Sequence, residues 1–214
     1  MSVRFIVYLA LLFVIIIIGL FNFKKLSSPY RLLTILVLIT FISELLTRYF
    51  ALVYANSSPV YHIYNPVQYF FITTFFSFFI KKSKTLISWS WVAFMAIVFI
   101  NILFFQTVWQ FSSNLILLYS PVYILLSLLL FKNMLLNIND TPLLKQRLFW
   151  YNTSSLFLYL FTFFCWSFYN ILLKSNSTRT VINVIYYLAI QYYIVTGIVI
   201  YLDSRHNKKI INAG

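Results

Sequence analysis

The sequence predicts an all-α, polytopic integral membrane protein with seven transmembrane helices, and three observations support this fold class. Of the 214 residues, 62% are hydrophobic and only 9% are charged, whereas soluble domains are about 25% charged. The apolar residues form continuous runs near the roughly 20 residues that cross about 30 Å of hydrocarbon. Strands of membrane barrels instead alternate apolar and polar positions over about ten residues. The continuous runs therefore favour helices, which satisfy their own backbone hydrogen bonds in lipid.

Four predicted spans occupy the first half of the chain. The first ends before Lys24 and Lys25, and the second begins at Arg31. A cluster of three lysines follows the third span, and the fourth runs to an aromatic segment near Phe105. Basic residues beside apolar runs are typical of span boundaries. The expected spans are 3–22, 31–54, 62–80 and 85–105.

Three further spans are predicted in the second half. The fifth ends before Lys132, the sixth begins after the basic pair Lys145 and Arg147, and the seventh ends before Arg205. The expected spans are 114–131, 149–173 and 181–202. Because no loop between spans is long enough for a soluble domain, we expect residues 1–214 to form a single transmembrane domain.

The distribution of lysine and arginine predicts the orientation. Twelve basic residues lie on one side of the predicted membrane and three on the other, while Arg48 lies inside a span. Cytoplasmic loops carry the excess of basic residues, so we expect the N-terminus outside and the C-terminus in the cytoplasm. The same distribution explains the net charge of +13 without a nucleic-acid partner. The Ile-, Phe- and Lys-rich composition suggests a bacterial inner membrane.

Spans 62–80 and 181–202 contain a weak internal similarity. Aligning Gln68 with Gln191 also pairs Tyr69 with Tyr192 and places two threonines together five residues further on. This pattern suggests two parallel three-helix repeats joined by the fourth span, a plan known among transporters. Coincidence is the alternative, because tyrosine and phenylalanine are abundant throughout the chain.

Glu44 and Arg48 are the strongest candidates for function. They lie four residues apart inside a span, and therefore on one helical face. Charged groups at membrane depth are costly and normally face the bundle interior or a water-filled cavity. The pair is predicted either to bind a ligand or to form a structural ion pair between helices.

A second polar group maps to the outer half of the bilayer. Together with the charged pair it could line a pocket open to the outside, although polar side chains also commonly join membrane helices. The predicted ligand-binding residues are Glu44, Arg48, His62, Asn65, Gln68, Asn170, Tyr187 and Gln191.

Four short stretches are distinctive: Ser43-Glu44-Leu45, the segment from Tyr61 to Pro66, Pro142 with Phe149-Trp150-Tyr151, and Ile182-Asn183. In these stretches the chain resembles a group of small seven-span membrane proteins from Bacteroidota-type bacteria. The resemblance implies the seven-span fold but no activity. An acidic residue often stands in that group where this chain has Gln68, which weakens any acid-based mechanism at that position.

The residue types argue against enzymatic chemistry. No carboxylate pair shares a helical face, no His, Cys and Asp spacing suits a metal, and the three glycines form no phosphate loop. We therefore expect no catalytic residues, metal or cofactor. The leading hypothesis is a sensor or accessory subunit that binds a small molecule or a segment of a partner membrane protein. A small-solute transporter is the first alternative, and a lipid-modifying enzyme is the second.

Overall fold

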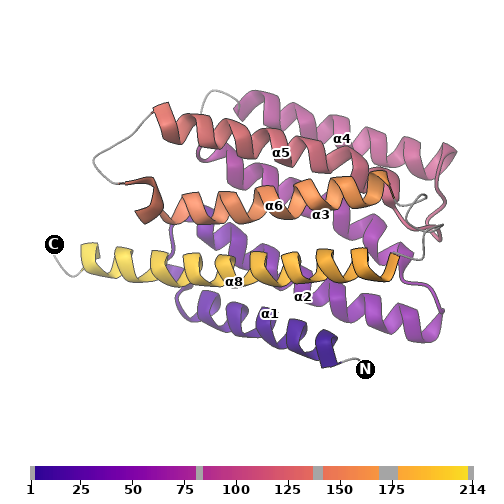
Figure 1. The fold of residues 1–214 in the computed structure, drawn as a ribbon, viewed down its shortest axis with the longest axis horizontal. Helices are drawn as coiled ribbons and strands as arrows, with labels where there is room; N and C mark the ends of the chain where they lie inside the picture. The colour runs from indigo at the N-terminus through magenta and orange to yellow at the C-terminus, as the bar shows by residue number, and fades with distance from the viewer. Residues whose placement is uncertain (1–2, 81–83, 137–141, 169–177, 212–214) are drawn as a thin grey trace.

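The structure is a computed structural model that describes residues 3–80, 84–136, 142–168 and 178–211 (Figure 1). These residues form seven α-helices, two short 3-10 helices and no strand, which confirms the all-α class. The α-helices are α1 (Val3–Phe21), α2 (Ser28–Val53), α3 (Ser58–Ser77), α4 (Lys84–Phe104), α5 (Ser113–Leu136), α6 (Arg147–Ser167) and α8 (Thr178–Ile211). The 3-10 helices are η1 (Phe23–Lys25) and η3 (Leu143–Lys145).

Among the described residues, six helices are long and apolar enough to cross a membrane: α1, α2, α4, α5, α6 and α8. The remaining helix, α3, has 20 residues and carries more polar side chains. It packs against α2, α4 and α5, and its buried positions include His62 and Asn65. Polar residues suit this helix because much of its surface faces protein rather than lipid.

The bundle has an apolar exterior and a partly polar interior. Large apolar side chains on the outside include Phe21, Leu103 and Leu136, which are 84%, 73% and 72% exposed. In contrast, Thr34 and Asn152 are fully buried. Soluble monomers rarely expose extended apolar surface, so this distribution supports a protein embedded in lipid.

Six helices close into a ring, and α4 lies outside it. Contacts join α1 to α2, α2 to α3, α3 to α5, α5 to α6, α6 to α8, and α8 back to α1. Helix α4 packs mainly on α3, and Figure 1 shows it beside α5 at one edge of the bundle. The first and last helices of the chain are therefore neighbours.

The observed bounds differ from the predicted spans by four residues or more at the start of α3 and at the ends of α5 (Leu136), α6 (Ser167) and α8. Helix α3 begins at Ser58, four residues before the expected start, because Pro59 occupies its first turn. Proline favours this position, where its missing N–H has no helical partner to lose. Pro66, which lies near the start of the predicted span 62–80, is inside the helix instead. Helix α8 continues to Ile211, beyond the expected end of the span.

The two ends of the bundle differ in charge. The "basic end" contains Lys24, Lys25, Arg31, Lys145 and Arg205, at the start of α2 and the end of α8. The "opposite end" contains the start of α1 and the connection between α4 and α5. Figure 1 places the chain termini at different ends, as the alternating directions of the helices require.

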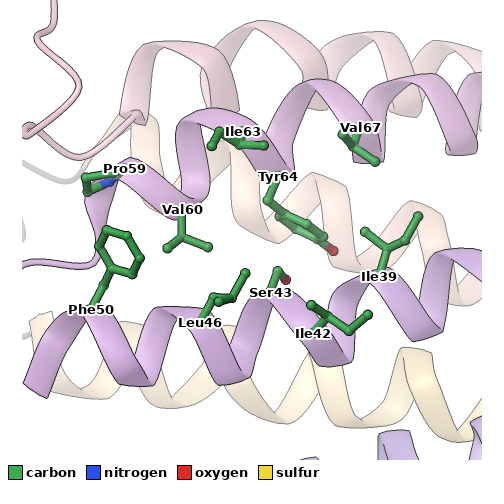
Figure 2. A pocket seen from close by; sticks show the side chains of 10 residues that line it. All are labelled: Ile39, Ile42, Ser43, Leu46, Phe50, Pro59, Val60, Ile63, Tyr64 and Val67. Atoms are coloured by element: carbon green, nitrogen blue, oxygen red, sulfur yellow. The ribbon is translucent and has the colours of Figure 1, made fainter.

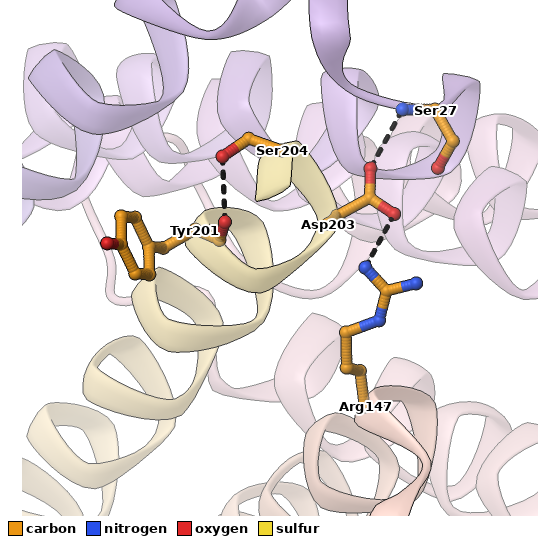
Figure 3. Close-up of polar contacts among 5 residues, drawn as sticks. All are labelled: Ser27, Arg147, Tyr201, Asp203 and Ser204. Atoms are coloured by element: carbon orange, nitrogen blue, oxygen red, sulfur yellow. Dashed lines mark hydrogen bonds and ion pairs between the residues drawn. The ribbon is translucent and has the colours of Figure 1, made fainter. Parts of the chain in front are cut away.

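One buried carboxylate joins three elements at the basic end (Figure 3). Asp203 of α8 is 3% exposed. Its Oδ1 lies 3.0 Å from Nη1 of Arg147, at the start of α6. Its Oδ2 accepts a hydrogen bond of 2.8 Å from the backbone N–H of Ser27, the N-cap residue of α2. We call this contact the Asp203 junction. It fixes the starts of α2 and α6 against the end of α8.

Candidate functional site

Hydroxyl groups from four helices meet inside the ring. The hydroxyls of Thr40 on α2 and Tyr64 on α3 lie 2.9 Å apart. The phenol of Tyr193 on α8 lies beside both of these hydroxyls and beside Tyr8 of α1. Tyr8 and Tyr193 also pack edge to face, with ring centroids 5.7 Å apart. We call these four residues the hydroxyl cluster.

Glu44 lies one turn along α2 from Thr40, beside the hydroxyl cluster. Its carboxylate interacts electrostatically with Tyr8, Tyr64 and Tyr193. The residue is half-buried, and within the described part of the chain no hydrogen-bond donor or basic group is bound to its carboxylate. A carboxylate at this depth is therefore left with partly unused acceptor capacity.

Arg48 is not paired with Glu44. Its side chain is exposed, one turn nearer the opposite end, and the two groups form no ion pair in the described residues. The helical spacing correctly places both on neighbouring turns of α2. The spacing alone does not show that Glu44 lies beside the hydroxyl cluster while Arg48 is exposed.

His62 and Asn65 attach α3 to the connection between α4 and α5. Nε2 of His62 lies 2.9 Å from the carbonyl oxygen of Gln110, and Nδ2 of Asn65 donates a hydrogen bond of 2.8 Å to Oγ of Ser112. Both residues are buried. Nε2 of His62 is consequently the protonated nitrogen, because a carbonyl can only accept. Its buried Nδ1 has no hydrogen-bond partner in the described residues.

The other predicted ligands are distributed over separate places. Gln68 donates a hydrogen bond of 3.4 Å to the hydroxyl of Tyr159 in the core. Tyr187 is exposed near the opposite end, with the guanidinium of Arg4 6.0 Å from its ring centroid. Gln191 is exposed on α8, and Asn170 lies outside the described residues. The seven described members of the predicted set are thus not brought together at one place.

A second polar region lies between the hydroxyl cluster and the basic end. Five buried residues of α5, α6 and α8 form it: Ser127, Asn152, Ser154, Ser155 and Thr196. Nδ2 of Asn152 donates to the backbone carbonyl of Ser127 at 2.9 Å. Oδ1 of Asn152 and the hydroxyls of Ser127 and Ser154 have no partner in the described residues. Buried polar atoms are usually satisfied by protein or water, so these atoms could bind water or a polar solute.

The proposed internal similarity has mixed structural support. Tyr69 and Tyr192 are both 3% exposed. Thr73 and Thr196 are both buried, and each donates its hydroxyl to the carbonyl four residues earlier. Gln68 and Gln191 differ, because the first is half-buried and the second is exposed.

An apolar groove separates α2 from α3 on the outside of the bundle (Figure 2). It has a volume of about 260 Å³. Ile42 and Leu46 line it from α2, and Ile63 from α3. Tyr64 extends across it toward α2 (Figure 2). Since Tyr64 also contacts Thr40, it separates the lipid-facing groove from the hydroxyl cluster.

Sequence reasoning identified Glu44 but missed its tyrosine neighbours. Tyr8, Tyr64 and Tyr193 lie well inside their helices, whereas tyrosines of the interfacial belt lie near helix ends. Their position away from the helix ends was the signal in the sequence that could have identified them as residues of the bundle interior. The sequence analysis likewise did not single out Asp203. An acidic residue at the end of a span, with several arginines at the same end, could have indicated an ion pair.

The chemistry of the site is that of polar recognition. The described residues contain no group of three or more His, Cys, Asp or Glu side chains that could hold a metal. The hydroxyl cluster supplies donors and acceptors, and Glu44 supplies a charge. No protein-family model, curated protein or solved structure matches the chain. The geometry of this membrane bundle is therefore the basis for assigning its function.

Proposed function

We propose that the protein binds a small polar molecule within the membrane, at Glu44 and the hydroxyl cluster, and acts as a sensor or accessory subunit of a partner membrane protein. The ligand enters from the opposite end of the bundle, which faces outward. One observation carries the proposal: a carboxylate without a bound donor in the described residues lies beside hydroxyls from four helices. Ionisable residues inside spans are costly and usually functional.

The residues around Glu44 suit a ligand with hydrogen-bond donors. A carboxylate accepts hydrogen bonds only, whereas tyrosine and threonine hydroxyls both donate and accept. The phenol rings add apolar surface and can contact a cation through their faces. An alcohol, amide or amine would satisfy this combination. Because Tyr8, Thr40, Tyr64 and Tyr193 belong to different helices, such a ligand would change the packing between helices, which a partner could detect.

The orientation and location of the protein form part of the same proposal. The basic end would face the cytoplasm of a bacterial cell, in accordance with the positive-inside rule. All seven α-helices, including α3, would then cross the inner membrane. The outer half of the bilayer would contain Glu44 and Tyr8.

Transport of a small solute is a second candidate, supported by a separate observation. The buried polar region of Ser127, Asn152 and Ser155 extends the polar interior from the hydroxyl cluster toward the basic end. The ring also divides into α1–α3 and α5–α8, with α4 outside it. This is the arrangement expected of two three-helix repeats with a connecting helix.

Cysteine accessibility tests the proposal and separates the two candidates. Cys165 is replaced by serine, and single cysteines are introduced at Thr40 and at Ser155. We expect a small water-soluble thiol reagent applied from outside to modify the Thr40→Cys variant. Failure to modify it in a folded protein would contradict an outward-open polar site. Modification of Ser155→Cys by the same reagent applied from the cytoplasmic side would show that the polar interior can also be reached from that side. This result would favour transport over sensing.

A ligand screen by thermal unfolding provides the complementary measurement. Small alcohols, amides and amines are tested with the wild type, Glu44→Gln and Gln191→Ala. A ligand of the site should raise the unfolding temperature of the wild type and of the Gln191→Ala control, but not that of Glu44→Gln. Equal stabilisation of all three proteins would place the ligand elsewhere.

A further inference from the structure

A second groove lies at the basic end, between η3 with the start of α6 on one side and α8 on the other. Its volume is about 380 Å³. One wall contains Leu144, Lys145, Arg147 and Trp150, and the other contains Val195, Ile198, Val199 and Leu202. Figure 1 shows α6 running beside α8, on which it packs. The groove is remote from Glu44 and belongs to neither proposed function.

The α8 wall is an apolar strip in which Ile198 and Leu202 face the outside of the bundle and Val199 is buried. Its members recur at spacings of three and four residues, which places them on one helical face. The seven-residue interval from Val195 to Leu202 extends about 10 Å along the helix. Ile198 and Leu202 are 53% and 42% exposed. Such a strip is long enough to contact the upper part of one acyl chain.

The end of the groove nearest the solvent is basic. The Lys145 side chain is exposed. Arg147 is held in place by Oδ1 of Asp203 at 3.0 Å and by the Tyr30 ring, 5.9 Å from its guanidinium carbon. Only one guanidinium nitrogen makes the contact with Asp203, and the Arg147 side chain is 27% exposed. Its orientation is therefore fixed, and its other N–H groups bind no acceptor within the described residues.

Trp150 completes the boundary between the apolar and basic parts. Its indole N–H donates a hydrogen bond of 2.8 Å to the carbonyl of Leu144, and half of its surface is exposed. Tryptophan is enriched at the level of lipid head groups. The groove thus has its basic side chains at head-group depth and its apolar strip at acyl-chain depth.

We propose that this groove is a binding site for one anionic phospholipid of the surrounding leaflet. The phosphate and its anionic head group contact Lys145 and Arg147, and an acyl chain lies along Ile198 and Leu202. Basic pockets between transmembrane helices select anionic lipids by this charge complementarity. A zwitterionic lipid has the same acyl chains but carries a cationic group that is repelled by Lys145.

Quenching of Trp150 fluorescence by brominated lipids tests the site. The full-length protein is placed in phosphatidylcholine vesicles containing the same fraction of brominated phosphatidylglycerol or brominated phosphatidylcholine. The difference between the wild type and Trp150→Phe isolates this indole from the other four tryptophans. We expect the brominated phosphatidylglycerol to occupy the groove about fivefold more, which corresponds to about 1 kcal/mol for one basic side chain.

Two matched variants distinguish a site from general surface charge. Lys145→Gln should abolish the preference for phosphatidylglycerol. Lys132→Gln, which removes an exposed basic residue at the end of α5, should retain it. Equal quenching by the two lipids, or equal losses in the two variants, would overturn the proposal. If Trp150→Phe does not fold, native mass spectrometry provides the test: the wild type and Lys132→Gln should retain one phosphatidylglycerol that Lys145→Gln loses, and equal retention would overturn the proposal.

Discussion

Nη1 of Arg147 lies 3.0 Å from Oδ1 of Asp203, so that the start of α6 is tied to the end of α8 across 56 positions of the chain. The second carboxylate oxygen of Asp203 receives the backbone N–H of Ser27. One side chain therefore fixes three elements, and all of them belong to the ring of helices. The Asp203 junction thereby holds the starts of α2 and α6 against the end of α8 at the basic end.

Replacing Asp203 by asparagine should destabilise the bundle. The substitution leaves the half-buried Arg147 without its counter-ion and weakens the N-terminal cap of α2. Loss of one partner from a buried pair costs about 3–5 kcal/mol, and less where one partner is partly exposed as here. Thermal unfolding in detergent would measure the change. If the double variant is no less stable than Arg147→Gln alone, the two residues act as a pair. If the losses of stability in the two single variants add up fully in the double variant, they do not.

Gly19 marks a close approach of α1 to α2. A Cβ atom at this position would clash with Cγ2 of Thr34 and lie 2.7 Å from its Oγ1, and Thr34 is fully buried. We therefore expect Gly19→Ala to lower the free energy of unfolding by about 1–3 kcal/mol. Thr34→Ala removes both obstructing atoms and should restore part of the stability in the double variant. No rescue would mean that the helices do not meet there.

The hydrogen bond between Thr40 and Tyr64 should contribute modestly to stability. Double-mutant cycles for polar pairs inside membranes average about 0.6 kcal/mol. We expect Thr40→Val and Tyr64→Phe to show a coupling of this size in thermal unfolding. The combination of Tyr64→Phe with Ser77→Ala, at the far end of α3, serves as the uncoupled control. A coupling energy of zero for Thr40 and Tyr64 would mean that their hydrogen bond does not contribute to stability.

Asn65 should control the mobility of the connection between α4 and α5. Without its hydrogen bond to Ser112, this connection keeps its hydrogen bond to His62 of α3 and the one to Asn56, which precedes α3. We expect Asn65→Ala to accelerate hydrogen exchange at residues 105–112. Gln68→Ala provides the control, because Gln68 contacts Tyr159 in the core instead. Similar acceleration in both variants would indicate a general loosening of α3.

The proposed orientation can be checked with two exposed positions. Thr107 lies in the connection between α4 and α5, and Lys132 near the end of α5. In a Cys165→Ser background, Thr107→Cys should react with an impermeant thiol reagent in intact cells. Lys132→Cys should react only after the membrane is opened. Reaction of both variants in intact cells would overturn the alternating topology of the spans.

The helices were predictable from the sequence, whereas the site was predictable only in part. Continuous apolar runs predicted the seven described α-helices, and six of these are long and apolar enough to cross a membrane, because crossing a bilayer constrains both length and composition. Pro59 shifted the start of α3 by a local effect that the apolar pattern does not contain. Glu44 was identified by the cost of a charge in lipid. Its relation to Tyr8 and Tyr193 depends on the contact between the first and last helices, which hydropathy does not encode.

The different fates of Glu44 and Arg48 have a similar cause. Helical periodicity places the two residues on neighbouring turns of α2. Because α2 contacts α1, α3 and α8, two residues on the same broad face of this helix can still have different neighbours. Only the packing of the ring determines which direction leads inward. For the same reason, the sequence could not show that His62 and Asn65 would contact the connection after α4.

Contact between the first and last helices has a consequence for biogenesis. Arg4 of α1 donates to Asn183 of α8, which follows 179 positions later. At about 5–20 residues per second, α1 waits about 10 to 40 s for its partner to be synthesised. During that interval the Tyr8 hydroxyl has no Tyr193 to contact and must be shielded from acyl chains by other means. A membrane insertase that retains early helices until the last one emerges would meet this need, and ribosome pausing before α8 would prolong it.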